Sequence, residues 1–321
     1  MSLQGLKAIF LLFWLASMPL AVLAQGMSVD EVQRFAATLR APARSKNSAA
    51  VLSSIKSYRQ KAAKPTEYFF VEVQDKLAFE GDFRSALAVV DDGLTVYPTS
   101  YRLYEARGNI FLSTFELDEA RKNMDKALSM APNNPSVLYH MGLLELAAER
   151  FPSALKYVDR AIAIKDEPTG LFQRDRGRIL RALKRYGEAE QAFRKAIAMC
   201  PANQSWELII IRDNLARTLV SHGQFEEAIK EYLLNTKSGG KGNADRYYQV
   251  GQCYLSLYKP SEALKNYLAA LKLAPDRREV HQGLSQAYEA LGDKNSAARH
   301  KGIVSRMDEE LAPGRSFSSG K

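Results

Sequence analysis

Apolar residues recur at helical spacing along most of the chain, in pairs of segments that short polar connectors separate. Tyr247, Val250 and Tyr254 fall three and four positions apart, and after a connector Ala263 and Tyr267 continue the same spacing. A period near 3.6 residues predicts amphipathic α-helices. The connectors, such as EGDF, KRYGE and SHGQF, are short, so the two helices of each pair are predicted to be neighbours in space.

The paired pattern repeats along the chain. Seven segments align on an alanine, at intervals of 34, 34, 35, 39, 35 and 34 residues: Ala86, Ala120, Ala154, Ala189, Ala228, Ala263 and Ala297. Twelve residues before each alanine the chain carries mostly small residues: Gln74, Gly108, Gly142, Gly177, Ala216, Gly251 and Ser285. Twelve residues after it, proline occurs four times: Pro98, Pro132, Pro201 and Pro275. Small residues let two helices cross closely, and proline ends a helix.

This pattern resembles the tetratricopeptide repeat over residues 67–311, about three quarters of the chain. The resemblance implies an all-α fold, a right-handed superhelical solenoid of about seven helix pairs. Each pair leaves an apolar face that only the next pair can cover, so the pairs stack. The predicted repeats lie near residues 67–100, 101–134, 135–169, 170–208, 209–243, 244–277 and 278–311.

The fifth and seventh repeats depart from the pattern. In the fifth, Asn235 and Gly240 replace an expected small residue and proline, and an insertion, QSWELI, precedes the first helix. Residues 236–243, TKSGGKGN, are predicted to be a flexible break. In the seventh, Lys301 and Glu309 occupy positions that elsewhere face a neighbour, as expected of a terminal repeat with one solvated face.

The N-terminal 66 residues contain two further kinds of segment. Residues 1–24 have a basic start at Lys7, a short apolar run and the exit Val-Leu-Ala, which predicts a signal peptide cleaved after Ala24 and a periplasmic or secreted protein. The alternative is an uncleaved membrane anchor, for which the run is short. Residues 25–66 are predicted to form an N-terminal helical cap or a degenerate repeat. A capping box at residues 28–31 begins one helix through about Leu39, and a second helix covers about Ser48 to Ala63. The tail, residues 312–321, is predicted to be disordered.

Composition narrows the function classes without choosing one. The formal net charge of +9 permits anionic partners. Nucleic acid is not expected, because the most basic stretch, RDRGRILRALKR at residues 174–185, lacks interleaved aromatic residues and the protein is predicted to be exported. The two cysteines, Cys200 and Cys253, are not expected to form a disulfide.

Enzyme signatures are missing from the sequence. The four histidines, which are His140, His222, His281 and His300, form no pair with metal-ligand spacing, and there is no P-loop or GxSxG motif. We therefore predict a non-catalytic protein without a metal or cofactor.

The resemblance implies that the first helices line a concave groove that holds a partner. Arg174, Arg178 and Arg181 are spaced by four and three residues, so they share one helix face, and Arg217 is expected to enter from the next repeat. The candidate groove residues are Arg174, Arg178, Arg181, Arg217, Tyr139, Leu143, Asn214, Tyr248 and Gln252. The arginines suit a carboxylate or phosphate, such as an acidic or C-terminal segment of another protein. The alternatives are a solvated basic ridge and, for Tyr139 and Leu143, cover by neighbouring helices.

The function predicted from these features is a non-catalytic adaptor in the bacterial cell envelope. It would bind another protein in its groove and assist a secretion, pilus, polysaccharide-export or envelope-maintenance complex. These four systems are ones in which members of the family are found, and no residue of this sequence decides among them. One alternative is a regulatory subunit that recruits or restrains an envelope enzyme such as a peptidoglycan hydrolase. A weaker alternative is a binder of an anionic small molecule or polysaccharide.

Overall fold

The computed structural model describes residues 28–61, 65–164, 170–200, 205–237 and 242–311. Within these ranges every regular element is an α-helix, so the chain has the predicted all-α fold. The predicted signal segment and the predicted disordered tail lie outside the described residues. Among the helices of the described ranges, none combines the length and the apolar character that crossing a membrane requires.

The helices fall into two compact units, divided between Leu183 and Lys184. The N-terminal unit contains α2 (Val29–Thr38), α3 (Arg40–Arg44), α4 (Ser48–Lys61), α5 (Glu67–Glu80), α6 (Phe83–Val96), α7 (Tyr101–Ser113), α8 (Leu117–Met130), α9 (Pro135–Ala147), α10 (Phe151–Ile162) and α11 (Gly170–Ala182). The C-terminal unit contains α12 (Tyr186–Met199), α13 (Ser205–Ser221), α14 (Phe225–Thr236), α15 (Asn243–Ser256), α16 (Pro260–Leu273), α17 (Arg278–Ala290) and α18 (Lys294–Leu311).

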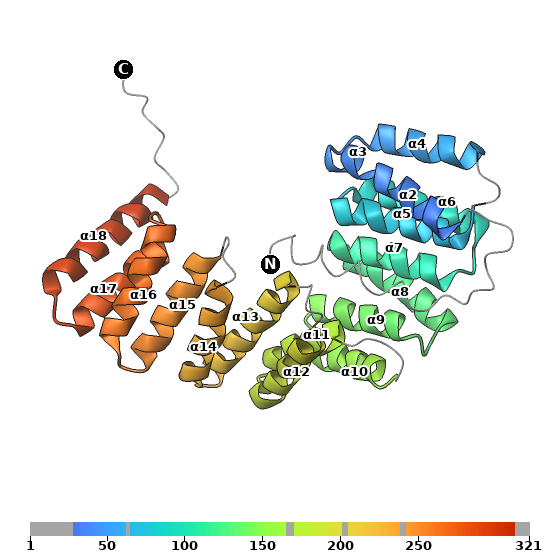
Figure 1. The fold of residues 1–321 in the computed structure, drawn as a ribbon. Coiled ribbons are helices and arrows are strands. Elements are labelled where there is room, and N and C mark those ends of the chain that lie inside the picture. Colours follow the sequence, from blue (N-terminus) through green and yellow to red (C-terminus); the bar gives the residue numbers. More distant parts are fainter. Residues whose placement is uncertain (1–27, 62–64, 165–169, 201–204, 238–241, 312–321) are drawn as a thin grey trace, which may run out of the picture. The chain divides into compact units, whose positions relative to one another are not determined.

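Within each unit, successive helices pack as neighbours. In the N-terminal unit the pairs are α5–α6, α7–α8 and α9–α10, and the first helices α5, α7, α9 and α11 also contact one another in order (Figure 1). In the C-terminal unit the pairs are α13–α14, α15–α16 and α17–α18, and α15 contacts α17. The first helices of the pairs therefore form one layer and the second helices form another, which is the stacked arrangement that the repeat pattern predicts.

The turn inside each helix pair has the same backbone conformation. One residue of each turn has a positive φ: Gly81, Phe115, Glu149, Lys184, Gly223, Tyr258 and Gly292. Their spacing, 34, 34, 35, 39, 35 and 34 residues, is that of the repeated alanines. Four of the seven are not glycine, although L-residues rarely adopt a left-handed conformation. The helix pairing therefore imposes the turn geometry even where the local sequence does not favour it.

Glycines on the first helices allow the second helices to approach closely. A Cβ added to Gly142 in α9 would lie 2.5 Å from Val158 Cγ2 in α10. In the C-terminal unit, the fully buried ring of Tyr267 in α16 lies against Gly251 in α15 and Gly283 in α17, where added Cβ atoms would be 2.5 and 2.6 Å from it. The small residues recognised in the repeat pattern thus mark the helix crossings.

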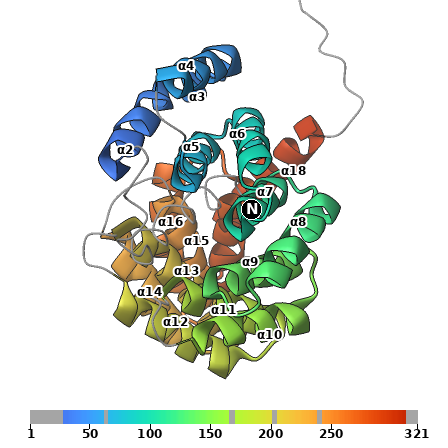
Figure 2. The same ribbon diagram turned by 90° about the vertical axis from the view of Figure 1, so that its right-hand side faces the viewer.

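The N-terminal helices cover the outer side of the first repeat. As predicted, Ser28 and Glu31 form a capping box at the start of α2, and a second long helix, α4, begins at Ser48. The Phe35 ring in α2 stacks on Tyr58 in α4, with 3.8 Å between ring centroids. Helices α2 and α3 contact α5, and α4 contacts α6 (Figure 2).

The insertion in the fifth repeat differs from the prediction. Helix α13 begins at Ser205, so the inserted residues lengthen the first helix rather than precede it. Asn235, at a position where a small residue is typical, is fully buried and donates hydrogen bonds to Ile209 O at 2.8 Å and Asp213 Oδ1 at 2.7 Å. Part of the predicted break, residues 238–241, lies outside the described residues. Cys200 and Cys253 do not form a disulfide with each other.

The close crossing at Gly142 generates the first prediction. We expect Gly142→Ala to lower the free energy of unfolding by about 1–3 kcal/mol, because the added methyl group must displace Val158 in a filled core. The matched control is Gly302→Ala in α18, where an added Cβ meets no atom within 4 Å. That change should stabilise the protein by about 0.5–1 kcal/mol through helix propensity. Urea unfolding followed by circular dichroism measures both, and equal effects would contradict the crossing argument.

Candidate functional site

Polar side chains on the first helices of the N-terminal unit bond from one repeat to the next. Each bond joins residues 33 to 36 positions apart, about one repeat. The partners are Ser100 with Glu67, His140 with Glu105, and Tyr139 with Asp175. We call this face of α5, α7, α9 and α11 the first-helix face. It is the surface on which the sequence places a partner.

Asp175 is the centre of the densest cluster on this face. Its carboxylate is fully buried and accepts a hydrogen bond from the Tyr139 hydroxyl at 2.5 Å. The Arg174 guanidinium donates through Nη2 at 2.8 Å and Nε at 3.3 Å, and Arg178 donates through Nη1 at 2.7 Å. Charged donors of this kind form the stronger hydrogen bonds in proteins. One buried carboxylate thus organises a tyrosine from α9 and two arginines from α11.

The electrostatics of the cluster keep Asp175 ionised. Burial by itself would raise the pKa of this carboxyl, but the charges of Arg174 and Arg178 and the hydrogen bonds from Arg174 and Tyr139 lower the pKa well below its usual value. Burial, together with the neighbouring Asp175 charge, raises the pKa of Tyr139 well above 10. Tyr139 is therefore a neutral donor and Asp175 a permanent acceptor at physiological pH.

Three candidate groove residues are less exposed than the sequence suggests. Arg174 is 4% exposed, Tyr139 is 1% exposed, and Leu143, at 9%, is also part of the core. Arg174 and Tyr139 are buried because both bond to Asp175, which is the single acidic residue in the basic stretch of residues 174–185. A buried carboxylate needs opposite charge and hydrogen-bond donors, and Arg174 and Tyr139 supply them. Arg178 and Arg181 remain partly exposed, so a partner on this face would meet these two arginines first.

Glu105, His140 and Ser136 form a second cluster, which the sequence analysis did not identify. Glu105 Oε1 accepts from the Ser136 hydroxyl at 2.5 Å and lies 2.6 Å from His140 Nδ1. A catalytic triad requires serine on one imidazole nitrogen and the acid on the other. Here Ser136 and Glu105 both approach Nδ1, with Ser136 3.5 Å away, so the arrangement ties α7 to α9 and does not activate a nucleophile. The 35-residue separation of Glu105 and His140 is the signal that could have revealed it.

Asp75 in α5 is a further residue of the first-helix face that the sequence pattern did not indicate. Gln74 Nε2 donates to its Oδ1 at 2.5 Å. Burial, with the added charges of Glu72 and Glu105, raises the pKa of Asp75 to about 8. This carboxyl is therefore mostly protonated at neutral pH, and it adds little negative charge to the first-helix face there.

The candidate residues of the C-terminal unit form separate contacts. Asp213 accepts a hydrogen bond from Arg246 Nη2 at 2.8 Å. Gln252 donates to the Tyr248 hydroxyl at 3.0 Å, and the Arg277 guanidinium lies 5.7 Å from the Tyr248 ring centroid. The amide of Asn214 donates to Ile210 O at 2.8 Å, and Arg217 is exposed. Arg217 belongs to the C-terminal unit, whereas the other three arginines belong to the N-terminal unit, so a joint four-arginine site stays a prediction.

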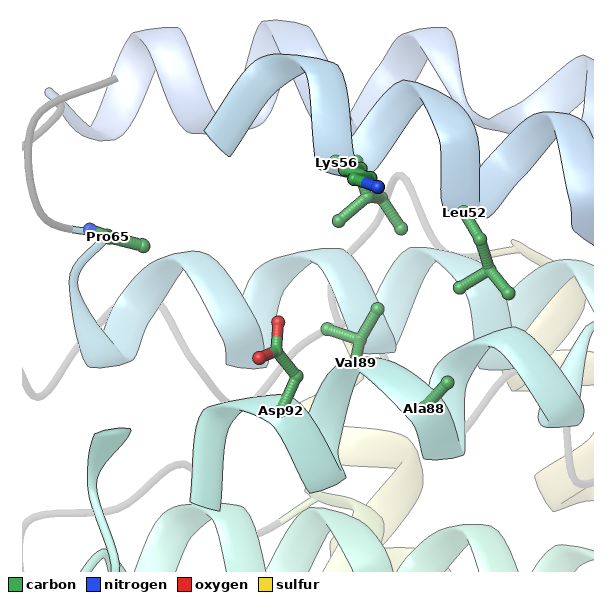
Figure 3. A pocket seen from close by; sticks show the side chains of 7 residues that line it. Leu52, Lys56, Pro65, Ala88, Val89 and Asp92 are labelled. Atoms are coloured by element: carbon green, nitrogen blue, oxygen red, sulfur yellow. The ribbon is translucent and has the colours of Figure 1, made fainter. Parts of the chain in front are cut away.

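A cavity of about 410 Å³ lies between α4 and α6 in the N-terminal unit. Figure 3 shows Leu52 and Lys56 of α4 on one side and Ala88, Val89 and Asp92 of α6 on the other. Its lining is mainly aliphatic, with no converging set of catalytic groups. Across the described residues, no three His, Cys, Asp or Glu side chains gather in a way that could hold a metal ion.

Sequence comparisons match the repeated region. Family models described as tetratricopeptide repeat match residues 101–134, 139–203 and 244–277. The chain is 22% identical to DnaJ homolog subfamily C member 3 of Gallus gallus over 214 residues, covering 63% of this chain and 42% of that protein. It is 29% identical to DnaJ homolog subfamily C member 7 of Homo sapiens over 147 residues, covering 43% and 28%. The chain thus spans less than half the length of these curated relatives.

Solved structures share the fold. PilF of Pseudomonas aeruginosa has a TM-score of 0.58 and 18% identity, over 68% of this chain and 97% of that chain. PilW, described as a type IV pilus biogenesis factor, has a TM-score of 0.61 and 20% identity, over 68% and 98%. YrrB, described as a protein with an unusual peptide-binding site, has a TM-score of 0.50 and 21% identity, over 60% and 95%.

The Asp175 cluster generates the second prediction. Asp175→Asn leaves Arg174 buried without a carboxylate, so we expect a loss of about 3–5 kcal/mol in the free energy of unfolding at pH 7. Because folding lowers the pKa of Asp175, this contribution is present above the ordinary value of 3.8 and declines as pH falls through and below it. The control is Asp91→Asn, whose half-exposed pair with Arg107 should contribute less than about 1 kcal/mol.

Urea unfolding at a series of pH values measures this prediction. The difference between the native protein and Asp175→Asn should narrow on acidification. A difference that stays constant to below pH 3 would contradict the role of an ionised Asp175.

Proposed function

Because the chain belongs to the tetratricopeptide repeat family, we propose that it is a non-catalytic scaffold that binds another protein in the bacterial cell envelope. In this proposal it assists assembly of a secretion, pilus, polysaccharide-export or envelope-maintenance complex. The observation that carries the proposal is the continuous first-helix layer of the N-terminal unit, in which α5, α7, α9 and α11 lie side by side and present one common face.

The character of that face supports a protein partner. Polar and charged side chains from neighbouring repeats are already bonded across it, so their positions are fixed before a partner arrives. Fixed side chains lose little conformational entropy on binding, which favours affinity and specificity. YrrB, a structural neighbour, is described by its peptide-binding site, which supports the same use here.

An acidic or C-terminal segment is the partner chemistry that we propose for the arginine end of the face. Arg178 and Arg181 lie on one side of α11, and Arg178 keeps 23% of its side chain exposed. Guanidinium groups bind carboxylates bidentately. Asp175 holds Arg174 and Arg178 in place, so Arg174 supports the site and does not itself have to reach the partner.

Two features support location in the envelope. The apolar run of residues 8–24, outside the described residues, has the pattern of a signal peptide. PilW, one of the structural neighbours, is described as a pilus biogenesis factor.

Export generates the third prediction. We expect the mature protein from the envelope fraction to begin at Gln25, measured by mass spectrometry of the intact chain and its N-terminal peptide. A protein that retains Met1 and fractionates with the cytoplasm would contradict export. Retention of Met1 in the membrane fraction would instead favour the membrane-anchored form.

Partner capture tests the scaffold itself and the arginine contact, which is the fourth prediction. Crosslinking in intact cells followed by affinity purification should recover one dominant protein with the native chain. Arg181→Glu should reduce that recovery at least tenfold. Recovery with the native chain should also fall as the salt concentration is raised, because the contact is ionic. The control is Arg160→Glu on α10, which makes the same charge change on a second helix.

The two parts of the proposal fail differently. If no protein is captured by the native chain, the scaffold function is wrong. If a protein is captured equally by the native chain and by Arg181→Glu, the scaffold stands and the arginine contact is wrong.

A further inference from the structure

Two histidines meet inside the last helix pair of the C-terminal unit. His281 on α17 and His300 on α18 place their Nδ1 atoms 2.9 Å apart, and the two rings are nearly parallel, with an interplanar angle of 29°. The Tyr288 ring stacks on His300, with 5.7 Å between centroids. His281 is only 6% exposed. The contact therefore joins α17 to α18 through one buried ring and one partly exposed ring.

The hydrogen-bond partners determine which nitrogens carry protons. His281 Nε2 lies 2.9 Å from the carbonyl oxygen of Pro275, which can only accept, so this nitrogen is the N–H donor. In a neutral His281 the Nδ1 atom is then bare and accepts from His300 Nδ1–H. Each nitrogen in the contact has a suitable partner when both rings are neutral.

The pair tolerates one added proton but not two. A proton on His300 Nε2 leaves the Nδ1–H donor intact, so the contact survives. A proton on His281 Nδ1 as well would set two N–H groups and two positive charges 2.9 Å apart. The doubly protonated pair thus loses its hydrogen bond and gains a repulsion.

The charged groups that act on His300 disfavour a positive charge on its ring. Burial lowers the pKa of His300, and the charges of His281 and Arg299 lower it further. Among the charged groups of the described residues, these two are the ones that act on His300, and neither is a carboxylate. The carboxylate of Asp308 on the same helix is held by Arg278 of α17, with Nη2 at 2.9 Å. Pro275, in the segment that follows α16, contributes only a neutral carbonyl group, which lies against His281.

We propose that His281 and His300 form an acid-sensitive latch that holds α18 on α17 until both imidazoles are protonated. Because the open form binds protons more readily than the closed form, the latch is fully closed above the ordinary histidine pKa of 6.5 and weakens as pH falls below it. Release of α18 would break the buried hydrogen bond that Ser285 Oγ of α17 donates to Ala297 O of α18. The end of the repeat stack would then be open at mildly acidic pH.

Hydrogen exchange with mass spectrometry on the full mature chain tests the latch. Between pH 7.5 and pH 5.0, after correction for the intrinsic exchange rate, we expect protection of α18 to fall about tenfold, because two protonated rings cannot keep the 2.9 Å contact between their Nδ1 atoms. Helix α10, which carries no histidine, serves as the internal reference and should keep its protection. Equal behaviour of α18 and the reference would overturn the proposal.

His300→Gln is the variant that separates the latch from general acid loosening. Glutamine can donate to a neutral His281 and, with its amide turned over, accept from a protonated one, so protection of α18 should no longer depend on pH. His222→Gln, at an exposed turn position in the same unit, is the control and should retain the full pH response. A response that persists in His300→Gln would overturn the latch.

A measurement on the unaltered protein covers the case in which the variant folds poorly. The chain has only four histidines, so selective ¹⁵N labelling resolves each ring by long-range NMR correlation. At pH 8 we expect His281 as the Nε2–H tautomer and His300 as the Nδ1–H tautomer. The opposite tautomer at either ring would overturn the proposal.

Discussion

The structure depends on one packing constraint: a helix pair of this sequence cannot bury its apolar face without a neighbouring pair. The constraint is visible where Tyr267 of α16 lies between Gly251 of its own repeat and Gly283 of the next. A single ring is shared by two repeats, so neither repeat has a complete core alone. The positive φ of Phe115 and Tyr258 follows from the same cause, because close pairing fixes the turn and the turn residue must accept it.

The same stacking brings polar side chains of successive first helices together. Residues one repeat apart in sequence become neighbours on the first-helix face, and this places His140 on Glu105 and Tyr139 on Asp175. The adjacent repeat supplies both partners of Glu105, whereas Asp175 receives Tyr139 from the adjacent repeat and two arginines from its own helix. The polar contacts therefore fix the register between repeats on one face, while the small residues at the crossings fix it in the core.

The repeat period, the helix pairs and the glycine crossings could be predicted because they depend on local spacing, which the sequence displays directly. The exposure of the candidate residues could not. Arg174 and Arg178 have the same residue type and the same predicted face, yet Arg174 is 4% exposed and the Arg178 side chain 23%. Both arginines bond to the buried Asp175 carboxylate, and a helical period predicts the shared face but not how deeply each side chain is buried. Likewise, the repeat pattern predicts a small residue at position 235. The larger Asn235 is accommodated there because Ile209 O and Asp213 Oδ1 of α13 accept its hydrogen bonds.

On the first-helix face, Arg174 and Arg178 are already paired with Asp175, and this pairing restricts how a partner can bind there. An acidic segment that approaches Arg178 competes with Asp175, whose carboxylate is buried and held by two further donors. In the proposed contact, the partner cannot displace Asp175 without leaving a buried charge unpaired, so it must bind Arg178 and Arg181 while the bonds to Asp175 stay intact. In the proposed contact, the buried Asp175 carboxylate therefore limits which acidic segments the arginine end of the first-helix face can accept.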